Sequence, residues 1–251
     1  MRFPAPIFAI PGNHDGDPID ATIEPSLAAF VSNFCSPTAR MTPEAQEVQR
    51  AAMTQPNVYW TLVAPFVTVV GLYTNVPEGG QVGDEQVRWL TDELRAADPE
   101  AGLIIALHHP AYSADSVHGG GAAMAEVLDT AMQEAGRLPT AVFTAHVHNY
   151  QRFSRRSNGR NLPYIVAGAG GYHTLHRIAK DADGNSLTPG WQPPDHPGVT
   201  LENFCDDQYG FMRVTASPGR LAVDYVVVGS PRDVPHTAPS VFESWSISWG
   251  P

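Results

Sequence analysis

The order of the apolar runs constrains the fold of this 251-residue chain more than any other feature of its sequence. Strand-like runs alternate with segments of helical periodicity. A strand that ends in a turn is expected at residues 6–12, and a hairpin or two strands broken at Pro65 at 58–74. Amphipathic helices are expected at 83–100 and 122–136, and buried strands at 102–110 and 140–148. Because strands and helices alternate along the sequence, we expect an α/β layered domain.

The last third of the sequence has a different pattern. Three β-rich segments separated by turns, at residues 164–171, 210–217 and 220–229, predict a mixed or antiparallel sheet. Residues 179–206 between them are polar, rich in Gly, Pro and Asp and without periodicity, so we expect a long surface loop there. No stretch is typical of a linker, and we expect one domain over residues 1–251.

Side chains that can bind metals follow three of the predicted strands. Ligands of α/β sheets bind beyond the carboxyl ends of the strands, so three such ends can converge on one site. The three sets are Asn13-His14-Asp15, His108-His109 and His146-x-His148.

Each of these segments, taken singly, has a simpler interpretation. A lone His or Asn at a strand end is more often a capping or turn residue than a ligand. His146 and His148 differ from that case, because residues two apart on a strand point to the same face and can each reach a metal at one site. Together the three segments favour a metal site.

In order and context these residues resemble the calcineurin-like metallophosphoesterases, and within them the purple acid phosphatase-like branch. The resemblance lies in "PGNHD", "LHHPAYS" and "AHVHNYQR", supported by "VGDEQVRWLTDEL", "IVAGAGG" and "DDQYGFMRV". It implies the four-layer αββα sandwich of that family. It also implies hydrolysis of phosphomonoesters or phosphodiesters by a metal-bound hydroxide at a dinuclear site.

The resemblance further implies a role for each residue. Asn13, His108 and His146 are expected to bind one ion and His148 the other; an amide oxygen with imidazoles suits Zn, Mn or Fe better than Ca²⁺. His14 is expected to steady the phosphoryl group or protonate the leaving oxygen. Asp15 is expected to orient His14, with a turn or helix cap as the alternative.

Two further histidines are candidates for binding the substrate. His118 lies in "SADSVHGGG", where purple acid phosphatases carry substrate-facing histidines, and an exposed loop histidine is the alternative. His109 is expected either to line the cleft or to pack beneath it. Tyr150 and Arg152 match the end of the family's last motif, but packing and solvation are the commoner roles of such residues.

Two motifs of the family are missing from this sequence. The family pattern begins with D-x-H and then G-D-x-x-D or G-D-x-x-Y, whereas eleven residues precede Gly12 and none of them is Asp or His. We therefore expect a chain without the N-terminal strand-helix units, in which at most one metal site is well formed. A start codon placed too far downstream, a fragment and a protein that has lost the chemistry are the three explanations. The alternative to an enzyme is a non-catalytic remnant.

Charge and hydropathy limit the other functional classes. With 15 Lys and Arg against 26 Asp and Glu, the net charge of −11 argues against binding to a nucleic-acid backbone and fits a small or locally docked substrate better. The family resemblance implies that this substrate is a small phosphoester. No apolar run approaches the roughly 20 residues that span a bilayer, and no signal peptide is visible, so the chain is expected to be soluble and its compartment stays open. Pairing of Cys35 with Cys205 and the oligomeric state also stay open.

Overall fold

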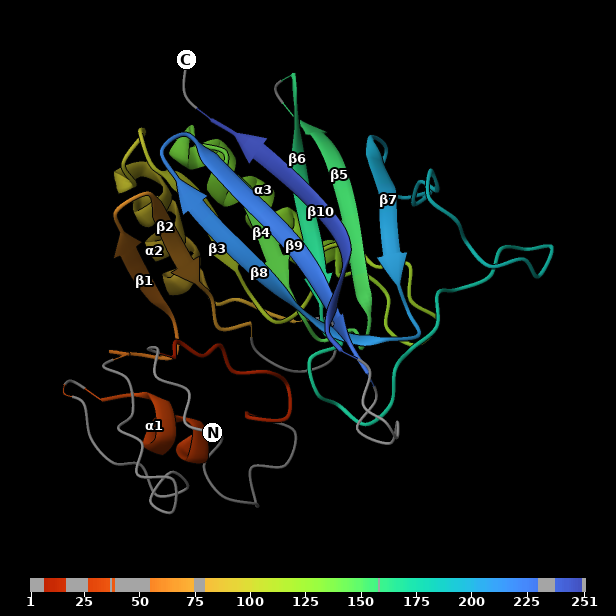
Figure 1. The fold of residues 1–251 in the computed structure, drawn as a ribbon. Coiled ribbons are helices and arrows are strands. Elements are labelled where there is room, and N and C mark those ends of the chain that lie inside the picture. Colours follow the sequence, from red (N-terminus) through yellow and green to blue (C-terminus); the bar gives the residue numbers. More distant parts are fainter. Residues whose placement is uncertain are drawn as a thin grey trace.

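The computed structural model describes most of the chain. The described residues are 7–16, 27–36, 38, 55–74, 80–157, 159–229 and 238–249. Within them, two β-sheets and a layer of helices are stacked on one another, and a short helix, α1 (Ala28–Phe34), lies beyond one end of β1 (Figure 1).

The larger sheet has seven strands in the order β1-β2-β3-β4-β6-β5-β7. The neighbours β2, β3, β4 and β6 run parallel, whereas β1, β5 and β7 pair antiparallel with their neighbours. The four parallel strands all lie inside the sheet, with a paired strand on each side, which explains their nearly continuous apolar sequences. The bounds of the seven strands are β1 Trp60–Ala64, β2 Val67–Gly71, β3 Gly102–Ala106, β4 Ala141–Thr144, β5 Tyr150–Ser157, β6 Arg160–Ala167 and β7 Val199–Cys205.

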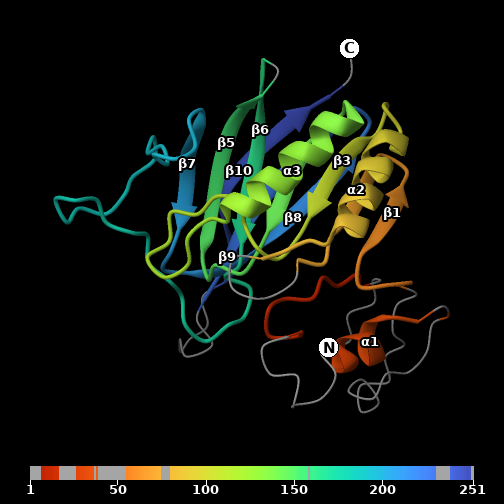
Figure 2. The same ribbon diagram turned by 180° about the vertical axis from the view of Figure 1, so that it is seen from behind.

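Two helices, α2 (Asp84–Ala96) and α3 (Ala122–Ala135), cover one face of this sheet (Figure 2). Their apolar faces and the strands form the main hydrophobic core, to which Leu90 and Leu94 of α2 and Leu128 of α3 contribute fully buried side chains. Helix α3 ends at Gly136, which adopts the left-handed conformation (φ 65°) that glycine tolerates at such ends.

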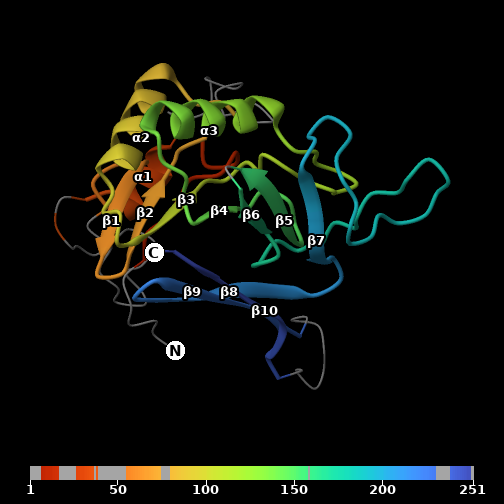
Figure 3. The same ribbon diagram turned by 90° about the horizontal axis from the view of Figure 1, so that it is seen from above.

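A second, three-stranded sheet covers the opposite face (Figure 3). It consists of β8 (Tyr209–Ser217), β9 (Arg220–Val228) and β10 (Ser240–Ser248), all antiparallel. A smaller apolar cluster joins the two sheets, and in it the rings of Tyr150 and Tyr225 stack with centroids 3.9 Å apart. The Tyr150 hydroxyl donates to Glu243, which also pairs with Arg152. Tyr150 therefore packs between the sheets, and Arg152 is engaged in an ion pair.

The α/β layered fold class is confirmed, and three of the four expected layers are seen: helices, large sheet and small sheet. No helix among the described residues covers the outer face of the small sheet. The hairpin and the helices at residues 84–96 and 122–135 form as predicted. The described residues also contain no helix long and apolar enough to cross a membrane.

The structure differs locally from the sequence prediction. The predicted loop at 179–206 is wrong at its end, because residues 199–205 form β7. The pairing of β7 with β5 supplies backbone hydrogen bonds that sequence periodicity cannot reveal. Residues 7–10 form no strand, and the sequence did not predict β10. Cys35 and Cys205 are both free thiols, so they do not pair.

Candidate metal centre

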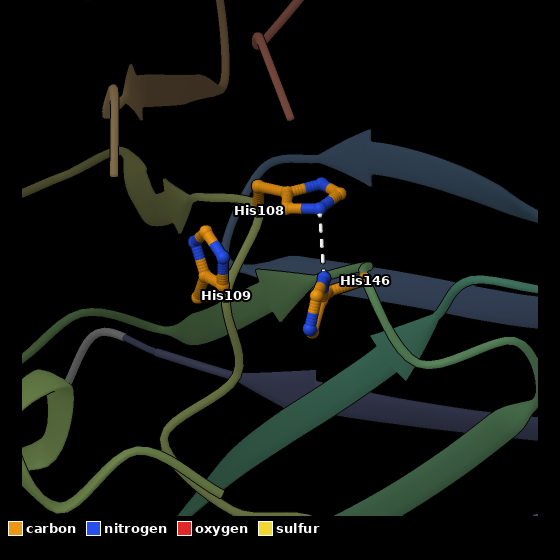
Figure 4. A group of neighbouring side chains, drawn as sticks. All are labelled: His108, His109 and His146. Atoms are coloured by element: carbon orange, nitrogen blue, oxygen red, sulfur yellow. Dashed lines mark hydrogen bonds between the residues drawn. The ribbon is translucent and has the colours of Figure 1, made fainter. Parts of the chain in front are cut away.

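The site lies where adjacent parallel strands end. His108 is two residues beyond the end of β3 and His146 two residues beyond the end of β4, and these two strands pair in parallel. The carboxyl ends of such strands meet at one edge of the sheet. This edge carries the imidazoles of His108, His109 and His146 (Figure 4).

Three donor atoms converge at this edge. Nε2 of His108 lies 2.9 Å from Oδ1 of Asn13 and 3.1 Å from Nδ1 of His146. Ligands held at about 2.1 Å on a tetrahedral ion are about 3.4 Å apart. Both distances are near that spacing, so Asn13 and His146 can each share an ion with His108, and their oxygen and nitrogen chemistry suits a transition metal.

The backbone around this cluster is shaped for close approach. Gly12 faces the His108 ring, where a Cβ atom would lie 2.7 Å from Cε1. His146 adopts the left-handed conformation (φ 62°), which is uncommon for a residue with a side chain and is typical of functional turns. This turn is held by the Val147 N–H, which donates to the Ala145 carbonyl, and by the Ala145 N–H, which donates to the His108 carbonyl.

The environment of His108 keeps its ring neutral. Burial lowers the pKa of His108 to about 3, and the neighbouring imidazoles of His109 and His146 act in the same direction. A neutral imidazole is the form that ligates metals, so protons do not compete for this ring at ordinary pH.

His109 is almost completely buried beside this cluster. Its Nδ1 lies 2.8 Å from Oγ1 of Thr74, and its ring centroid lies 4.6 Å from that of His146. The ligand atoms of His108, His109 and His146 all lie within 4.8 Å of one another. His109 thus packs beneath the site and also borders the pocket next to it.

That pocket has a volume of about 210 Å³. Three imidazoles border it, those of His109, His118 and His146, and the centroid of the His118 ring lies 4.6 Å from that of His146. Its other lining residues are small or uncharged: Pro110, Val117, Gly119, Gly120 and Gly121. A pocket with imidazole N–H groups and no carboxylate suits an anion.

The prediction that His146 and His148 share one face of a strand is wrong, because β4 ends at Thr144 and both residues lie in the turn that follows it. His148 lies outside the cluster of His108, His109 and His146, which is called the three-histidine cluster below. Its Nδ1–H donates to the Thr174 carbonyl at 3.1 Å. Its ring packs against those of Tyr172 and His176, each with its centroid 4.2 Å away and tilted by 35° and 36°. Partial burial lowers the pKa of His148, and the neighbouring His176 lowers it further.

His14 and Asp15 are exposed, and Asp15 closes a turn. Its Oδ2 accepts a hydrogen bond of 2.8 Å from the Gly12 N–H, and its own N–H donates to the Gly12 carbonyl at 3.2 Å. The described residues contain no hydrogen bond between Asp15 and His14. This geometry matches a turn cap, the alternative role of Asp15 in the sequence. The role of Asp15 in orienting His14 stays a prediction.

Two residues near the site were not selected from the sequence. His176 lies against His148, and the buried carboxylate of Asp115 lies 3.1 Å from Nδ1 of His176. A signal for His176 was present, because it belongs to the segment that follows β6. Strand β6 pairs in parallel with β4, so its carboxyl end opens at the same edge.

Comparison with known proteins identifies the family. The sequence pattern of the calcineurin-like phosphoesterases matches residues 1–150. The chain is 26% identical over 173 residues to purple acid phosphatase 21 of Arabidopsis thaliana and 28% identical over 175 residues to purple acid phosphatase 22 of the same plant. Each alignment covers 66% of this chain and 36% of the relative, so the chain spans little more than a third of their length.

The fold is also similar to that of a purple acid phosphatase. A purple acid phosphatase isolated from yellow lupin (Lupinus luteus) seeds superposes with a TM-score of 0.61 at 17% identity, over 95% of this chain and 40% of that one. The motif order, the fold and the family match agree, and the chain belongs to the calcineurin-like phosphoesterase family, on its purple acid phosphatase-like branch.

Proposed function

We propose that this chain carries part of the active site of a metal-dependent phosphoesterase that hydrolyses phosphomonoesters or phosphodiesters. The observation that supports this most is the convergence of Asn13 and His146 on His108. Oδ1 of Asn13 and Nδ1 of His146 lie 2.9 and 3.1 Å from Nε2 of His108. A transition-metal ion bound by such donors would neutralise phosphoryl oxygens and lower the pKa of a water molecule enough for it to act as a nucleophile.

The residues around the metal ligands then have separate tasks. His118 borders the 210 Å³ pocket beside His146 and would donate a hydrogen bond to a phosphoryl oxygen there. His109, fixed by Thr74, would form the wall behind it. His14 is exposed beside Asn13 and can reach solvent, so it is our candidate for giving a proton to the leaving oxygen.

A dinuclear centre is part of this proposal, with His148 on the second ion. Fe, Zn and Mn are the metals that the oxygen and nitrogen donors suit. An alternative is a chain that binds one ion without turnover. One observation favours that alternative. In the described part of the chain, the three-histidine cluster is the only group of three or more His, Cys, Asp or Glu residues whose ligand atoms lie within 4.8 Å of one another. It contains no carboxylate that could bridge two ions.

Metal analysis combined with turnover distinguishes the two. The purified protein is analysed for bound metal and assayed with p-nitrophenyl phosphate and bis-p-nitrophenyl phosphate. We expect turnover that falls at least about 100-fold in His148→Ala and in His108→Ala and is unchanged in His173→Ala, a nearby exposed histidine. One bound ion without turnover would favour the alternative, and a protein that neither binds metal nor turns over either ester would overturn the proposal.

A further inference from the structure

Asp115 connects three segments around the site, although its carboxylate is fully buried. Oδ2 accepts hydrogen bonds from the backbone N–H groups of Val117 and His118, at 3.0 and 2.9 Å. Oδ1 accepts one from the Asn149 amide at 3.0 Å, and Oδ2 lies 3.1 Å from Nδ1 of His176. Burying a carboxylate is costly unless it is well hydrogen-bonded, so this arrangement holds His176 firmly.

The carboxylate also determines which nitrogen of His176 is available. An ionised carboxylate only accepts hydrogen bonds, so Nδ1 of His176 carries the proton that it donates to Asp115. In the neutral ring, Nε2 then has the lone pair. Within the described part of the chain, no hydrogen bond is made by Nε2 of His176.

His148 is oriented in the same way by a different acceptor. Its Nδ1–H donates to the Thr174 carbonyl at 3.1 Å, which leaves the lone pair on Nε2. The His148 and His176 rings lie 4.2 Å apart at an interplanar angle of 36°. Two hydrogen bonds fix this pairing: the His176 N–H donates to the His148 carbonyl, and the side-chain Nδ2 of Asn149 donates to the His176 carbonyl.

An imidazole that donates one N–H to a carboxylate or a carbonyl and presents its other nitrogen is the usual arrangement of a metal-binding histidine. We propose that His148 and His176 together form a two-imidazole half-site for the second transition-metal ion, with Asp115 as the positioning residue of His176. This inference rests on the proposed function and adds to it a second protein ligand from this chain. The remaining positions of the ion stay open for water or phosphoryl oxygens.

The tautomers and the metal contacts can be measured together by NMR of protein labelled with ¹⁵N in its histidine rings. Long-range ¹H–¹⁵N correlations distinguish a protonated ring nitrogen from one with a lone pair. We expect His148 and His176 to be protonated at Nδ1, and Zn²⁺ to shift the Nε2 resonances of both rings at the same concentration. His196, whose ring lies against Tyr112, serves as the internal reference.

The outcomes separate this inference from the proposed function. If Zn²⁺ shifts His108 and His146 while Nε2 of His176 is unchanged, or if His176 is protonated at Nε2, the half-site is wrong and the first metal centre stands. If none of these histidines responds to Zn²⁺, the proposed function fails as well.

Substitutions give a second test by Zn²⁺ stoichiometry in calorimetric titration. His176→Ala is expected to reduce binding from two ions to one, and His173→Ala, from the same segment, to leave two. Asp115→Asn keeps the size of the side chain but removes its charge, and we expect the second ion to bind about 10- to 100-fold more weakly. Two bound ions in folded His176→Ala would overturn the proposal. If that variant does not fold, the NMR measurement on the unsubstituted protein is the deciding test.

Discussion

Gly168 lies directly against the carbonyl of Val147, so closely that a Cβ atom on Gly168 would stand 1.9 Å from that oxygen. Val147 separates His146 from His148, and the Gly168 N–H donates to the Asn149 carbonyl. The glycine-rich end of β6 is therefore a packing surface for the turn that carries both histidines.

This contact predicts the effect of Gly168→Ala. The added methyl group meets backbone atoms that cannot rotate away, so the turn or β6 must shift. We expect a loss of about 1–3 kcal/mol in the free energy of unfolding, together with weaker Zn²⁺ binding. Chemical denaturation and calorimetric titration measure the two effects.

Gly171→Ala is the matched control, because a Cβ atom there meets nothing within 4 Å. It should bind Zn²⁺ as the unsubstituted protein does. Equal loss of binding in both variants would show that the close contact at Gly168 does not hold the turn.

A second prediction concerns Gly12 and the ring of His108. A Cβ atom at Gly12 would lie 2.7 Å from Cε1 and 3.0 Å from Nδ1 of that ring. Because the neighbour is a side chain, the ring would be displaced more easily than the backbone. In Gly12→Ala we expect Zn²⁺ affinity to fall by at least about tenfold, or about 1.4 kcal/mol, with little change in stability.

Gly83→Ala tests the specificity of that effect, since a Cβ atom at Gly83 has no neighbour within 4 Å. Calorimetry gives the affinity and thermal unfolding gives the stability. If Gly12→Ala binds Zn²⁺ as tightly as Gly83→Ala, the His108 ring is not held in its ligating position by this contact.

Much of the site's chemistry was predictable because strand ends can be recognised from apolar runs. His108 and His146 follow buried strands, so their convergence follows from the parallel sheet. Asn13 was predicted to follow a strand as well, but residues 7–10 form no strand, so its position beside His108 does not follow from the sheet. His176 was missed because eight residues separate it from β6, and what brings it back to His148 is the buried carboxylate of Asp115, a tertiary contact.

The fold shows the same division between local and long-range causes. Helix α3 and its end at Gly136 follow from periodicity and one glycine. Strand β7 lies in a segment rich in Gly and Pro, and pairing with β5 makes it a strand. Local sequence predicts elements that are stable by their own pattern, and partners decide the others.

The pH dependence of stability should reveal the contact between the sheets at Glu243. Burial acts to raise the pKa of this carboxyl, but hydrogen bonds from Arg152 and Tyr150 outweigh it, so the net effect lowers the pKa. A lowered folded-state pKa gives stability that is present above the unfolded value, 4.5, and is lost as the pH falls through the folded value. Urea denaturation between pH 7 and pH 3 measures this loss.

Substitution assigns that loss to one residue. Glu243→Gln should lower the free energy of unfolding by about 1.5–3 kcal/mol at pH 7, the usual contribution of hydrogen bonds to a charged group, and the difference should shrink below pH 4.5. Glu126→Gln, on the exposed face of α3, should have little effect at either pH. A difference for Glu243→Gln that is the same at pH 7 and pH 3 would contradict the assignment.

The last prediction concerns His118 and the pocket that it borders. With Zn²⁺ bound, we expect inorganic phosphate to occupy the pocket between His118 and His146, because imidazole N–H groups line it and no carboxylate does. His118→Ala should weaken phosphate binding by about 10- to 100-fold, since a hydrogen bond to a charged group contributes about 1.5–3 kcal/mol. Zn²⁺ affinity should be unchanged, because His118 is not among the proposed ligands. The two affinities are separable by calorimetry, with Zn²⁺ titrated first and phosphate second, and His173→Ala should change neither. If phosphate binds His118→Ala and the unsubstituted protein equally well, His118 does not contact the anion.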